Sequence, residues 1–274
     1  MTFPAVSAVV VSYMTGPRLK ECLYALLGDP EIGEIVIVDN GNPASIRDWL
    51  TSFVARHDAV QLVTGHGNIG FGAGVNRGVS NAAGPHILVL NPDAVLRRRS
   101  IQGMQVEAEN CAEPWIIGGR IFDIYGREER GPRRRELTLW RAMTSFLGWN
   151  TWTLEGTAAP ITPVSMPVIS GAFFLTSKAS LAMLDGFDEG YFLHVEDVDL
   201  CRRCREAGGQ VIYDPRAGAL HYGSTSDAPN ATVSRHKAES LAHYFRKFAG
   251  GPLERSILWL ALPVMRLGMR LAGR

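Results

Sequence analysis

A run of apolar residues that stops at a proline and a carboxylate constrains the fold of this chain most. Residues 87–90 (ILVL) have the composition of a buried strand, and Asn91-Pro92-Asp93 follows them directly. Because proline cannot continue a central strand, Asp93 is expected at the mouth of a sheet. Ligands of open α/β sheets bind at the carboxyl ends of the strands, so Asp93 is a candidate ligand of a hard cation or a polar group. The same three residues also suit an ordinary turn.

Two earlier segments repeat this arrangement and indicate the fold class. Residues 6–13 (VSAVVVSY) are too apolar for a half-exposed strand, which is typical of a central parallel strand. Residues 18–27 have the apolar spacing of a helix, and residues 34–38 (EIVIV) form a second buried strand that ends at Asp39. A chain of 274 residues with this alternation is expected to fold as one large α/β domain or two small ones.

A glycine-rich segment, residues 65–78 (GHGNIGFGAGVNRG), follows a short third strand. Glycines let the backbone approach a ligand closely, and the N–H groups at the start of the following helix suit phosphate. With Asp93 after the next strand, Gly72, Gly74 and Gly78 also resemble a dinucleotide-binding fingerprint, although that fingerprint normally opens a Rossmann domain. A functional loop is the preferred interpretation, and a flexible loop is the alternative.

Composition argues against some classes of function. The net charge of +1 provides no global basic field, so nucleic acid is not expected as the main partner. The four cysteines include one C-x-x-C pair, Cys201 and Cys204, without a second pair to complete a zinc site, and reduced thiols are the simplest interpretation. No signal peptide is visible at the N-terminus, so a cytoplasmic location is expected.

The second half of the chain carries polar groups beside apolar segments. Ser170-Gly171-Ala172 places small side chains inside an apolar run, as if another group packs against this backbone. Glu196, Asp197 and Asp199 open a helical segment, where the helix dipole favours acids even without a catalytic role. His221 by itself is more often a satisfied histidine than a ligand.

Two segments are amphipathic. Residues 128–152 combine five arginines with aromatic residues, and would form either a lip that meets acidic head groups or a diphosphate, or a solvated charge run beside a packed helix. Residues 253–271 are strongly apolar but short for a membrane span and interrupted by Pro263 and Arg266. An interfacial helix is expected there, with packing on the domain as the alternative.

The order of these motifs resembles the inverting glycosyltransferases of family 2, which have the nucleotide-sugar-binding GT-A fold. The motifs are VVVSY (9–13), IVIVDN (35–40), GNIGFGAGVNRG (67–78), ILVLNPD (87–93), SGAFFL (170–175), GFDEGYFLHVEDVDLCRRCREAG (186–208) and ALHYGSTS (219–226). They span roughly four fifths of the chain, and the pairing of NPD with the GFDE…EDVDL block is specific. More narrowly, the chain is similar to the bacterial rhamnosyltransferase-like branch that builds lipid-linked or cell-envelope polysaccharide.

The resemblance implies an α/β fold of the GT-A type: a Rossmann-like, mostly parallel central sheet flanked by helices, with a C-terminal helical tail. Residues 1–250 would form the glycosyltransferase domain. Residues 251–274 would form an amphipathic helix that associates with a membrane or packs on the domain.

The resemblance also implies roles for single residues. Asp39 would accept the ring N–H of a pyrimidine base, in a pocket lined by Ser12 and Tyr13. The remaining donor-binding residues would be Asn68, Phe71, Asn76, Asn91 and Asp93. Asp197 matches the catalytic base, and the acceptor-side residues would be Gly171, Glu196 and Asp199.

A divalent cation, Mg or Mn, belongs to the implied site. Asp93 stands where the D-x-D motif of the family places its metal-binding carboxylate, and Asn91 replaces the first acid of that motif. His221 matches a histidine that completes the metal shell in this branch. The chain departs from the family at Met14, where asparagine is usual, at Asp185, where glycine is usual, and at His194, where an aromatic residue is more usual.

The activity implied is metal-dependent transfer, with inversion, from a nucleotide diphosphate sugar. L-Rhamnose from dTDP-rhamnose is the first expectation, and a UDP-hexose is the alternative. The acceptor would be a glycan or a polyprenyl-diphosphate-linked sugar, with peripheral contact at the cytoplasmic face of the inner membrane. Two other classes stay open: an NAD(P)-dependent oxidoreductase, which rests on the glycine spacing, and a non-catalytic glycan-assembly partner.

Overall fold

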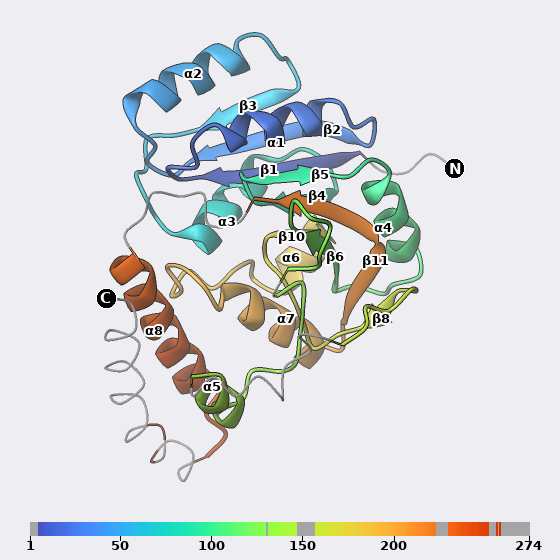
Figure 1. Ribbon diagram of the computed structural model, residues 1–274, viewed down its shortest axis with the longest axis vertical. Helices are drawn as coiled ribbons and strands as arrows, with labels where there is room; N and C mark the ends of the chain where they lie inside the picture. The colour runs from blue at the N-terminus through green and yellow to red at the C-terminus, as the bar shows by residue number, and fades with distance from the viewer. Residues whose placement is uncertain are drawn as a thin grey trace.

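The computed structural model describes residues 5–129, 131–146, 157–222 and 230–251, together with 256 and 258. Within these residues one large sheet runs through the molecule, and helices cover both of its faces (Figure 1). The strands lie in the order β3-β2-β1-β4-β10-β6-β11-β5, and β8 pairs with β11. The strands of this sheet are β1 Val6–Ser12, β2 Ile32–Asp39, β3 Val60–Val63, β4 His86–Leu90, β5 Ala94–Leu96, β6 Trp115–Phe122, β8 Val164–Ser165, β10 Phe173–Ser177 and β11 Gln210–His221. The helices are α1 Arg18–Leu27, α2 Ala44–Val54, α3 Phe71–Asn81, α4 Ser100–Ala108, α5 Leu139–Phe146, α6 Lys178–Met183, α7 Glu196–Glu206 and α8 Asn230–Lys247.

The N-terminal half of the sheet is parallel. Strand β1 pairs with β2 up to the pair Ser12↔Asp39, and on its other edge with β4. All residues of β1 are buried, as the apolar run predicted, because helices cover both faces of the strand. Since neighbouring parallel strands end at the same edge, the residues that follow β1, β2 and β4 are brought together there.

The other half of the sheet is mixed. Strand β10 is antiparallel to β4 and β6, β6 is parallel to β11, and β11 is antiparallel to β5 and β8. Four of the eight pairings in the described part are parallel, so the α/β fold is confirmed, but the sheet is mostly parallel only in its N-terminal half. Because β10 runs opposite to β4, with Phe173 paired to Leu90, the residues before β10 lie at the edge where β4 ends.

A second, two-stranded sheet covers this edge. Strand β7 (Arg133–Arg134) pairs with β9 (Val168–Ile169). The apolar run 168–175 is therefore divided between two sheets, with Ser170, Gly171 and Ala172 between them. A Cβ on Gly171 would lie 3.1 Å from Asp197 Cβ, so the packing partner expected at these small residues is the Asp197 side chain.

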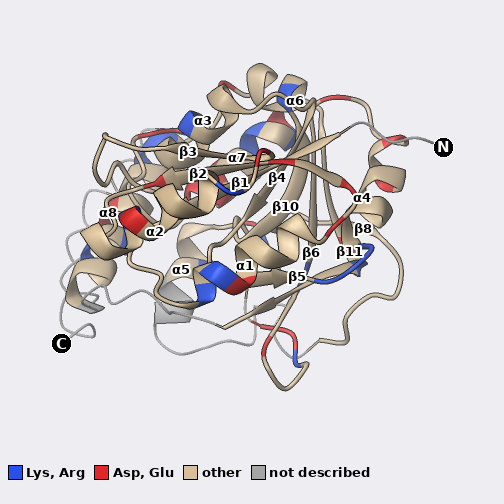
Figure 2. Ribbon diagram, turned by 90° about the horizontal axis from the view of Figure 1, so that it is seen from above, with Lys and Arg blue, Asp and Glu red and all other residues tan. Residues whose placement is uncertain are grey.

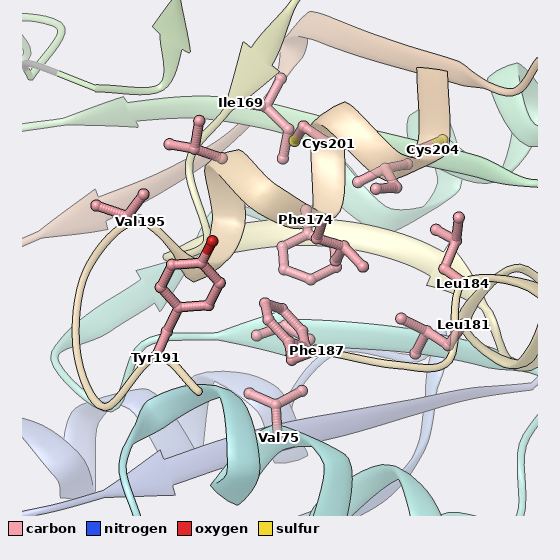
Figure 3. Close-up of a cluster of buried hydrophobic side chains, with 14 of the residues drawn as sticks. Val75, Ile169, Phe174, Leu181, Leu184, Phe187, Tyr191, Val195, Cys201 and Cys204 are labelled. Atoms are coloured by element: carbon pink, nitrogen blue, oxygen red, sulfur yellow. The ribbon is translucent and has the colours of Figure 1, made fainter. Parts of the chain in front are cut away.

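Apolar cores lie on both faces of the large sheet. Helices α1, α2 and α4 contribute to one core, and α3, α6, α7 and α8 to the other. In the second core, Phe174 of β10 lies with Phe187 and Tyr191 beside α7, and Val75 of α3 closes the cluster (Figure 3). This packing holds the segment between α6 and α7, and therefore the start of α7, against the sheet.

Charged residues of both signs are spread over the helices and loops (Figure 2). In α7 three of the four acids lie in the first turn and two arginines in the last, as the helix dipole favours. None of the helices within the described residues has both the length and the hydropathy that a bilayer-spanning segment needs. Most of the predicted tail, at 252–255, 257 and 259–274, lies outside the described residues.

Candidate active site

The polar residues singled out from the sequence meet at one edge of the sheet. Ser12 ends β1, Asp39 ends β2, and Asn91 follows β4. His221 ends β11, where it pairs with Ala94, the residue directly after Asp93. The strand ends therefore assemble residues that are up to about two hundred positions apart in the chain.

Asp39 is almost completely buried, with 2% of its surface exposed, and its own loop holds the carboxylate. Its Oδ1 accepts the backbone N–H of Asn42 at 2.8 Å and the Asn42 side-chain amide at 2.8 Å. Its Oδ2 accepts the hydroxyl of Thr64 at 3.1 Å. The Asn42 amide also donates to the Ser12 carbonyl at 3.0 Å, so Asn42, for which the sequence predicted no role, joins the ends of β1 and β2.

Met14 has a left-handed backbone beside this pocket, with φ of 51°. Its N–H donates to Asn42 Oδ1 at 2.8 Å, which holds the turn in place, and the neighbouring Tyr13 is half-buried. The Cβ of an ordinary residue collides with the following carbonyl in this conformation, whereas asparagine tolerates it. The asparagine usual in the family thus fits this backbone better than the methionine found here.

The glycine-rich segment divides into a loop and a helix, and Asn40 closes the loop. Its amide donates to Asn68 Oδ1 at 3.0 Å and to the Gly70 carbonyl at 3.1 Å, and its Oδ1 accepts the Ile69 N–H at 3.1 Å. Gly70 has φ of 90°, and a Cβ there would lie 2.5 Å from the Phe192 carbonyl oxygen. The loop is therefore tied both to the end of β2 and to the segment before α7.

The three glycines of the supposed dinucleotide fingerprint lie inside α3, where each faces a side chain of a neighbouring segment and not open space. A Cβ on Gly72 would lie 3.1 Å from Phe187 Cβ, one on Gly74 2.8 Å from Val11 Cγ1, and one on Gly78 2.4 Å from Val9 Cγ1. They allow α3 to lie close on β1 and the Phe187 ring. The dinucleotide interpretation of this spacing is therefore wrong, and the oxidoreductase alternative loses the motif that supported it.

Of the donor-side residues predicted in this segment, Asn68 is exposed, whereas Phe71 and Asn76 are engaged with the segment before α7. The Phe71 ring meets the Phe187 ring edge-on at 6.3 Å. The Asn76 side chain accepts the Phe187 N–H at 2.8 Å and donates to the Phe187 carbonyl at 2.8 Å. Asn76 thus positions that segment, and direct contact of these three residues with a donor stays a prediction.

Asp93 and His221 form one polar corner of the site. Asp93 is buried, and His221 Nε2 lies 3.1 Å from Asp93 Oδ1. The two groups form an ion pair when the ring is protonated, and Nε2 has no other hydrogen-bond partner among the described residues. On the other side of the ring, Nδ1 lies 2.9 Å from Glu129 Oε2. Burial lowers the pKa of His221, but the carboxylates of Asp93 and Glu129 outweigh it and raise this pKa to about 9.

The Asp93 and His221 corner fits a divalent cation. When His221 gives up its Nε2 proton, this buried nitrogen and the Asp93 carboxylate form a set of donor atoms that such ions accept. Glu129 binds the opposite ring nitrogen, as carboxylates commonly do for metal-ligating histidines, and so leaves Nε2 for the ion. Over the described ranges, no group of three or more His, Cys, Asp and Glu side chains surrounds a common point. The corner therefore offers two protein ligands in this part of the chain.

Asp197, the predicted base, forms the second corner with Gly171. Asp197 Oδ2 accepts the Gly171 N–H at 2.8 Å and Arg134 Nη2 at 2.5 Å, and Oδ1 accepts the Val198 N–H at 2.8 Å. The two corners are joined through Ala172, whose carbonyl accepts the Asn91 N–H at 2.8 Å. Consecutive residues before β10 therefore touch the residues that follow β4 and the start of α7.

The other two acids in the first turn of α7, Glu196 and Asp199, lie in different surroundings. Glu196 is 6% exposed, and burial, together with the nearby charge of Asp197, raises its pKa to about 8. Asp199 is completely buried and binds Arg203 Nε at 2.5 Å, Lys247 Nζ at 2.7 Å and Tyr191 Oη at 3.1 Å. The carboxylate of Asp199 thus faces α8 and the core, and its expected acceptor-side role stays a prediction.

Comparison with known families identifies the class of protein. The family model described as glycosyl transferase family 2 matches residues 7–182. The chain belongs to this family and is a glycosyltransferase.

Two curated proteins of related sequence indicate a branch within the family. The chain is 29% identical over 251 residues to the N-acetylglucosaminyl-diphospho-decaprenol L-rhamnosyltransferase of Mycobacterium tuberculosis (strain ATCC 25618 / H37Rv), covering 84% of this chain and 81% of that protein. It is 24% identical over 227 residues to the rhamnosyltransferase WbbL of Escherichia coli (strain K12), covering 78% and 82%. The chain is thus rhamnosyltransferase-like within the family.

Solved structures confirm the GT-A fold. The mannosyltransferase PcManGT from Pyrobaculum calidifontis, in complex with GDP-Man and Mn²⁺, superimposes with a TM-score of 0.62 at 16% identity over 100% of this chain and 74% of that one. GalNAc-T7 with UDP, GalNAc and Mn²⁺ gives a TM-score of 0.65 at 13% identity over 86% of this chain and 48% of that one.

Proposed function

We propose that this glycosyltransferase is inverting and metal-dependent, and that it moves L-rhamnose from dTDP-rhamnose to a lipid-linked or envelope polysaccharide acceptor. The observation that carries the proposal is the joining of the two polar corners, Asp93 with His221 and Asp197 with Gly171, through the residues before β10. One corner suits the leaving group and the other suits the attacking hydroxyl. The names of the two rhamnosyltransferase relatives support the choice of sugar. A UDP-hexose donor is the alternative.

On the donor side, the chain holds the nucleotide and the diphosphate. Asp39, kept rigid by Asn42 and Thr64, would accept the ring N–H of the pyrimidine beside Ser12 and Tyr13. Asp93 and His221 would hold Mg²⁺ or Mn²⁺, which supplies positive charge to the departing diphosphate when it is bound. The N–H of Asn91 is engaged with Ala172, so Asn91 keeps this loop in place.

On the acceptor side, Asp197 would take the proton of the attacking hydroxyl. The oxygen of that hydroxyl bonds to the anomeric carbon while the bond from this carbon to the phosphate oxygen breaks, and its electron pair leaves with the nucleoside diphosphate. Attack and departure occur on opposite faces, so the configuration inverts without a covalent intermediate. Gly171 and Glu196 line the acceptor side beside Asp197.

The acceptor proposal also concerns the place of the protein in the cell. One relative is named for a diphospho-decaprenol acceptor, which favours a lipid-linked acceptor at the cytoplasmic face of the inner membrane. In this proposal, residues 251–274 contribute a peripheral membrane contact. Deleting them should move the protein from the membrane pellet to the soluble fraction, and an unchanged distribution would count against the contact.

The central experiment measures release of nucleoside diphosphate from a panel of nucleotide sugars. With Mn²⁺ and a short-chain N-acetylglucosaminyl-diphospho-polyprenol, dTDP-rhamnose should give the fastest turnover, and EDTA should abolish it. Asp197→Asn should lower kcat by about 10²- to 10⁴-fold, since general base catalysis contributes that much. Asp93→Ala should weaken Mn²⁺-dependent binding of the donor.

Asp48→Asn, which changes an exposed acid on α2, is the matched control and should leave turnover unchanged. Full activity in Asp197→Asn would remove the base assignment. Faster turnover with a UDP-hexose would identify that nucleotide sugar, and not dTDP-rhamnose, as the donor.

A further inference from the structure

Arg134 reaches the predicted base from a part of the chain without a family motif. It lies on β7, which pairs with β9 so that Arg134 faces Val168 in register. Strand β9 leads directly into Ser170 and Gly171. The small sheet thereby places the guanidinium over the start of α7, where Nη2 donates to Asp197 Oδ2 at 2.5 Å and to the Ile169 carbonyl at 2.9 Å.

The two oxygens of Asp197 are used unequally. Oδ2 accepts from Arg134 of β7 and from the N–H of Gly171, which follows β9, at 2.8 Å. Oδ1 accepts only the Val198 N–H of its own helix among the described residues. A carboxylate oxygen has room for two hydrogen bonds, so Oδ2 is fully occupied while Oδ1 keeps capacity for a substrate hydroxyl.

Arg134 contacts only one of the two adjacent carboxyl groups at the start of α7. Glu196 is buried beside Asp197, and its Oε2 has no hydrogen-bond partner among the described residues. The guanidinium is bonded to Asp197 and not to Glu196. Arg134 therefore acts by hydrogen bonding on Asp197 and not on the carboxyl next to it.

We propose that Arg134 is a positioning residue for sugar transfer, which holds Oδ2 of Asp197 so that Oδ1 faces the acceptor hydroxyl. This inference rests on the proposed role of Asp197 as the base. In the step concerned, the proton of the acceptor hydroxyl passes to Oδ1 as its oxygen bonds to the anomeric carbon and the nucleoside diphosphate leaves.

The first test compares Arg134→Gln with Arg134→Lys, using dTDP-rhamnose, Mn²⁺ and short-chain N-acetylglucosaminyl-diphospho-polyprenol, or the donor that the panel identifies. Arg134→Gln should lower kcat by about 10²-fold, the size expected when a reacting group is misplaced, with both KM values nearly unchanged. Arg134→Lys should recover part of the loss, because one ammonium can reach Asp197 but cannot reproduce the guanidinium fork. Arg127→Gln removes an exposed arginine from the segment before β7 and should behave as the wild type.

A competing role predicts a different result. The remaining N–H groups of Arg134 would suit a phosphate, and its side chain is 35% exposed. If Arg134 binds a substrate diphosphate, the KM of the donor or of the polyprenyl acceptor rises in Arg134→Gln and kcat changes little. That outcome would overturn the inference. Thermal unfolding of each variant shows whether a loss of kcat follows a loss of folded protein.

The double variant Arg134→Gln/Asp197→Asn tests whether Arg134 acts through Asp197. Relative to Asp197→Asn alone, it should lose no further activity, because residues that act as one unit are not additive. Losses that multiply would contradict the inference. If Asp197→Asn itself keeps full turnover, the assignment of Asp197 as the base in the proposed function is wrong. If Asp197→Asn is impaired and Arg134→Gln is not, only the proposed role of Arg134 is wrong.

Discussion

At the scale of single residues, the site depends on close approaches that only small or rigid side chains permit. Gly171 lies against Asp197: its N–H donates to Oδ2, and a Cβ there would be in tight contact with the Asp197 side chain. Asn42, which is 5% exposed, holds Asp39 in place by hydrogen bonds. Its side-chain amide donates both to the Asp39 carboxylate and to the Ser12 carbonyl at the end of β1. Each of these two predicted site acids is thus held by a neighbour for which no chemical role is proposed.

Gly171→Ala tests this dependence. The new Cβ would lie 3.1 Å from Asp197 Cβ and 3.4 Å from Oδ2, so Asp197, the proposed base, must move by a few tenths of an ångström. The backbone of Gly171 is not left-handed, and alanine can adopt it. We expect kcat to fall by about tenfold or more with little change in unfolding temperature, because small misplacements of a reacting group are costly. Steady-state kinetics and thermal unfolding check this, and an unchanged kcat would contradict the tight contact.

At the scale of elements, the packing of α3 explains the glycine spacing that looked like a phosphate-binding motif. Gly74 and Gly78 face Val11 and Val9 of β1, so the helix lies directly on the sheet. The loop before the helix is separate, and Asn40 and Gly70 shape it. In this glycine-rich stretch, the glycines of the first half therefore allow the loop conformation, and those of the second half allow α3 to pack closely on the sheet.

Gly78→Ala should destabilise the protein although alanine favours helices. Its Cβ would lie 2.4 Å from Val9 Cγ1 and 3.1 Å from Val38 Cγ2, and the expected cost of such overpacking is about 1–3 kcal/mol. Gly103→Ala in α4 is the matched control, because the nearest atom to its Cβ is Asp214 Oδ2 at 3.7 Å. There the gain in helix propensity should raise the free energy of unfolding by about 0.5–1 kcal/mol. Denaturant unfolding measures both, and equal effects would contradict the packing argument.

At the scale of the whole molecule, α8 joins the two segments that carry the acidic motifs. Lys247 Nζ lies 2.5 Å from Asp188 Oδ2, before α7, and 2.7 Å from Asp199 Oδ2, within α7. His243 also lies 3.2 Å from Asp188 Oδ2, and its ring meets Tyr191 edge-on at 4.6 Å. The C-terminal half of the chain thereby holds the wall of the site in place.

This network predicts how stability depends on pH. Burial raises the pKa of Asp188, but Lys247, the Gly190 N–H and His243 outweigh it and lower this pKa from 3.8 to about 2. A carboxyl with a lowered pKa stabilises the fold above its unfolded value and loses that contribution as the pH falls through the folded value. Between pH 4 and pH 2 the free energy of unfolding of the wild type should therefore fall by about 2 kcal/mol more than that of Asp188→Asn. Urea unfolding across this range, with Asp48→Asn as the control, measures the difference in slope.

Much of the fold and part of the site follow from local sequence. The strands that end at Ser12, Asp39 and Leu90 are recognisable because a strand covered on both faces must be apolar throughout. The carboxylates Asp39 and Asp93 are recognisable because they interrupt such runs. Arg134, Glu129 and Asn42 are not, because their contacts with Asp197, His221 and Ser12 join residues 30 to 92 positions apart, and no spacing along the chain encodes such pairs.

The sequence by itself determined where the strands end and therefore which acids lie at the edge of the sheet, since both depend on local apolar patterning. Only the tertiary structure decided which acids lie at the site and which are buried in the core. Asp197 and Asp199 are two residues apart on one helix and therefore face different sides. Packing against Gly171 and Arg134 leaves Asp197 at the site, and contact with Lys247 buries Asp199 in the core.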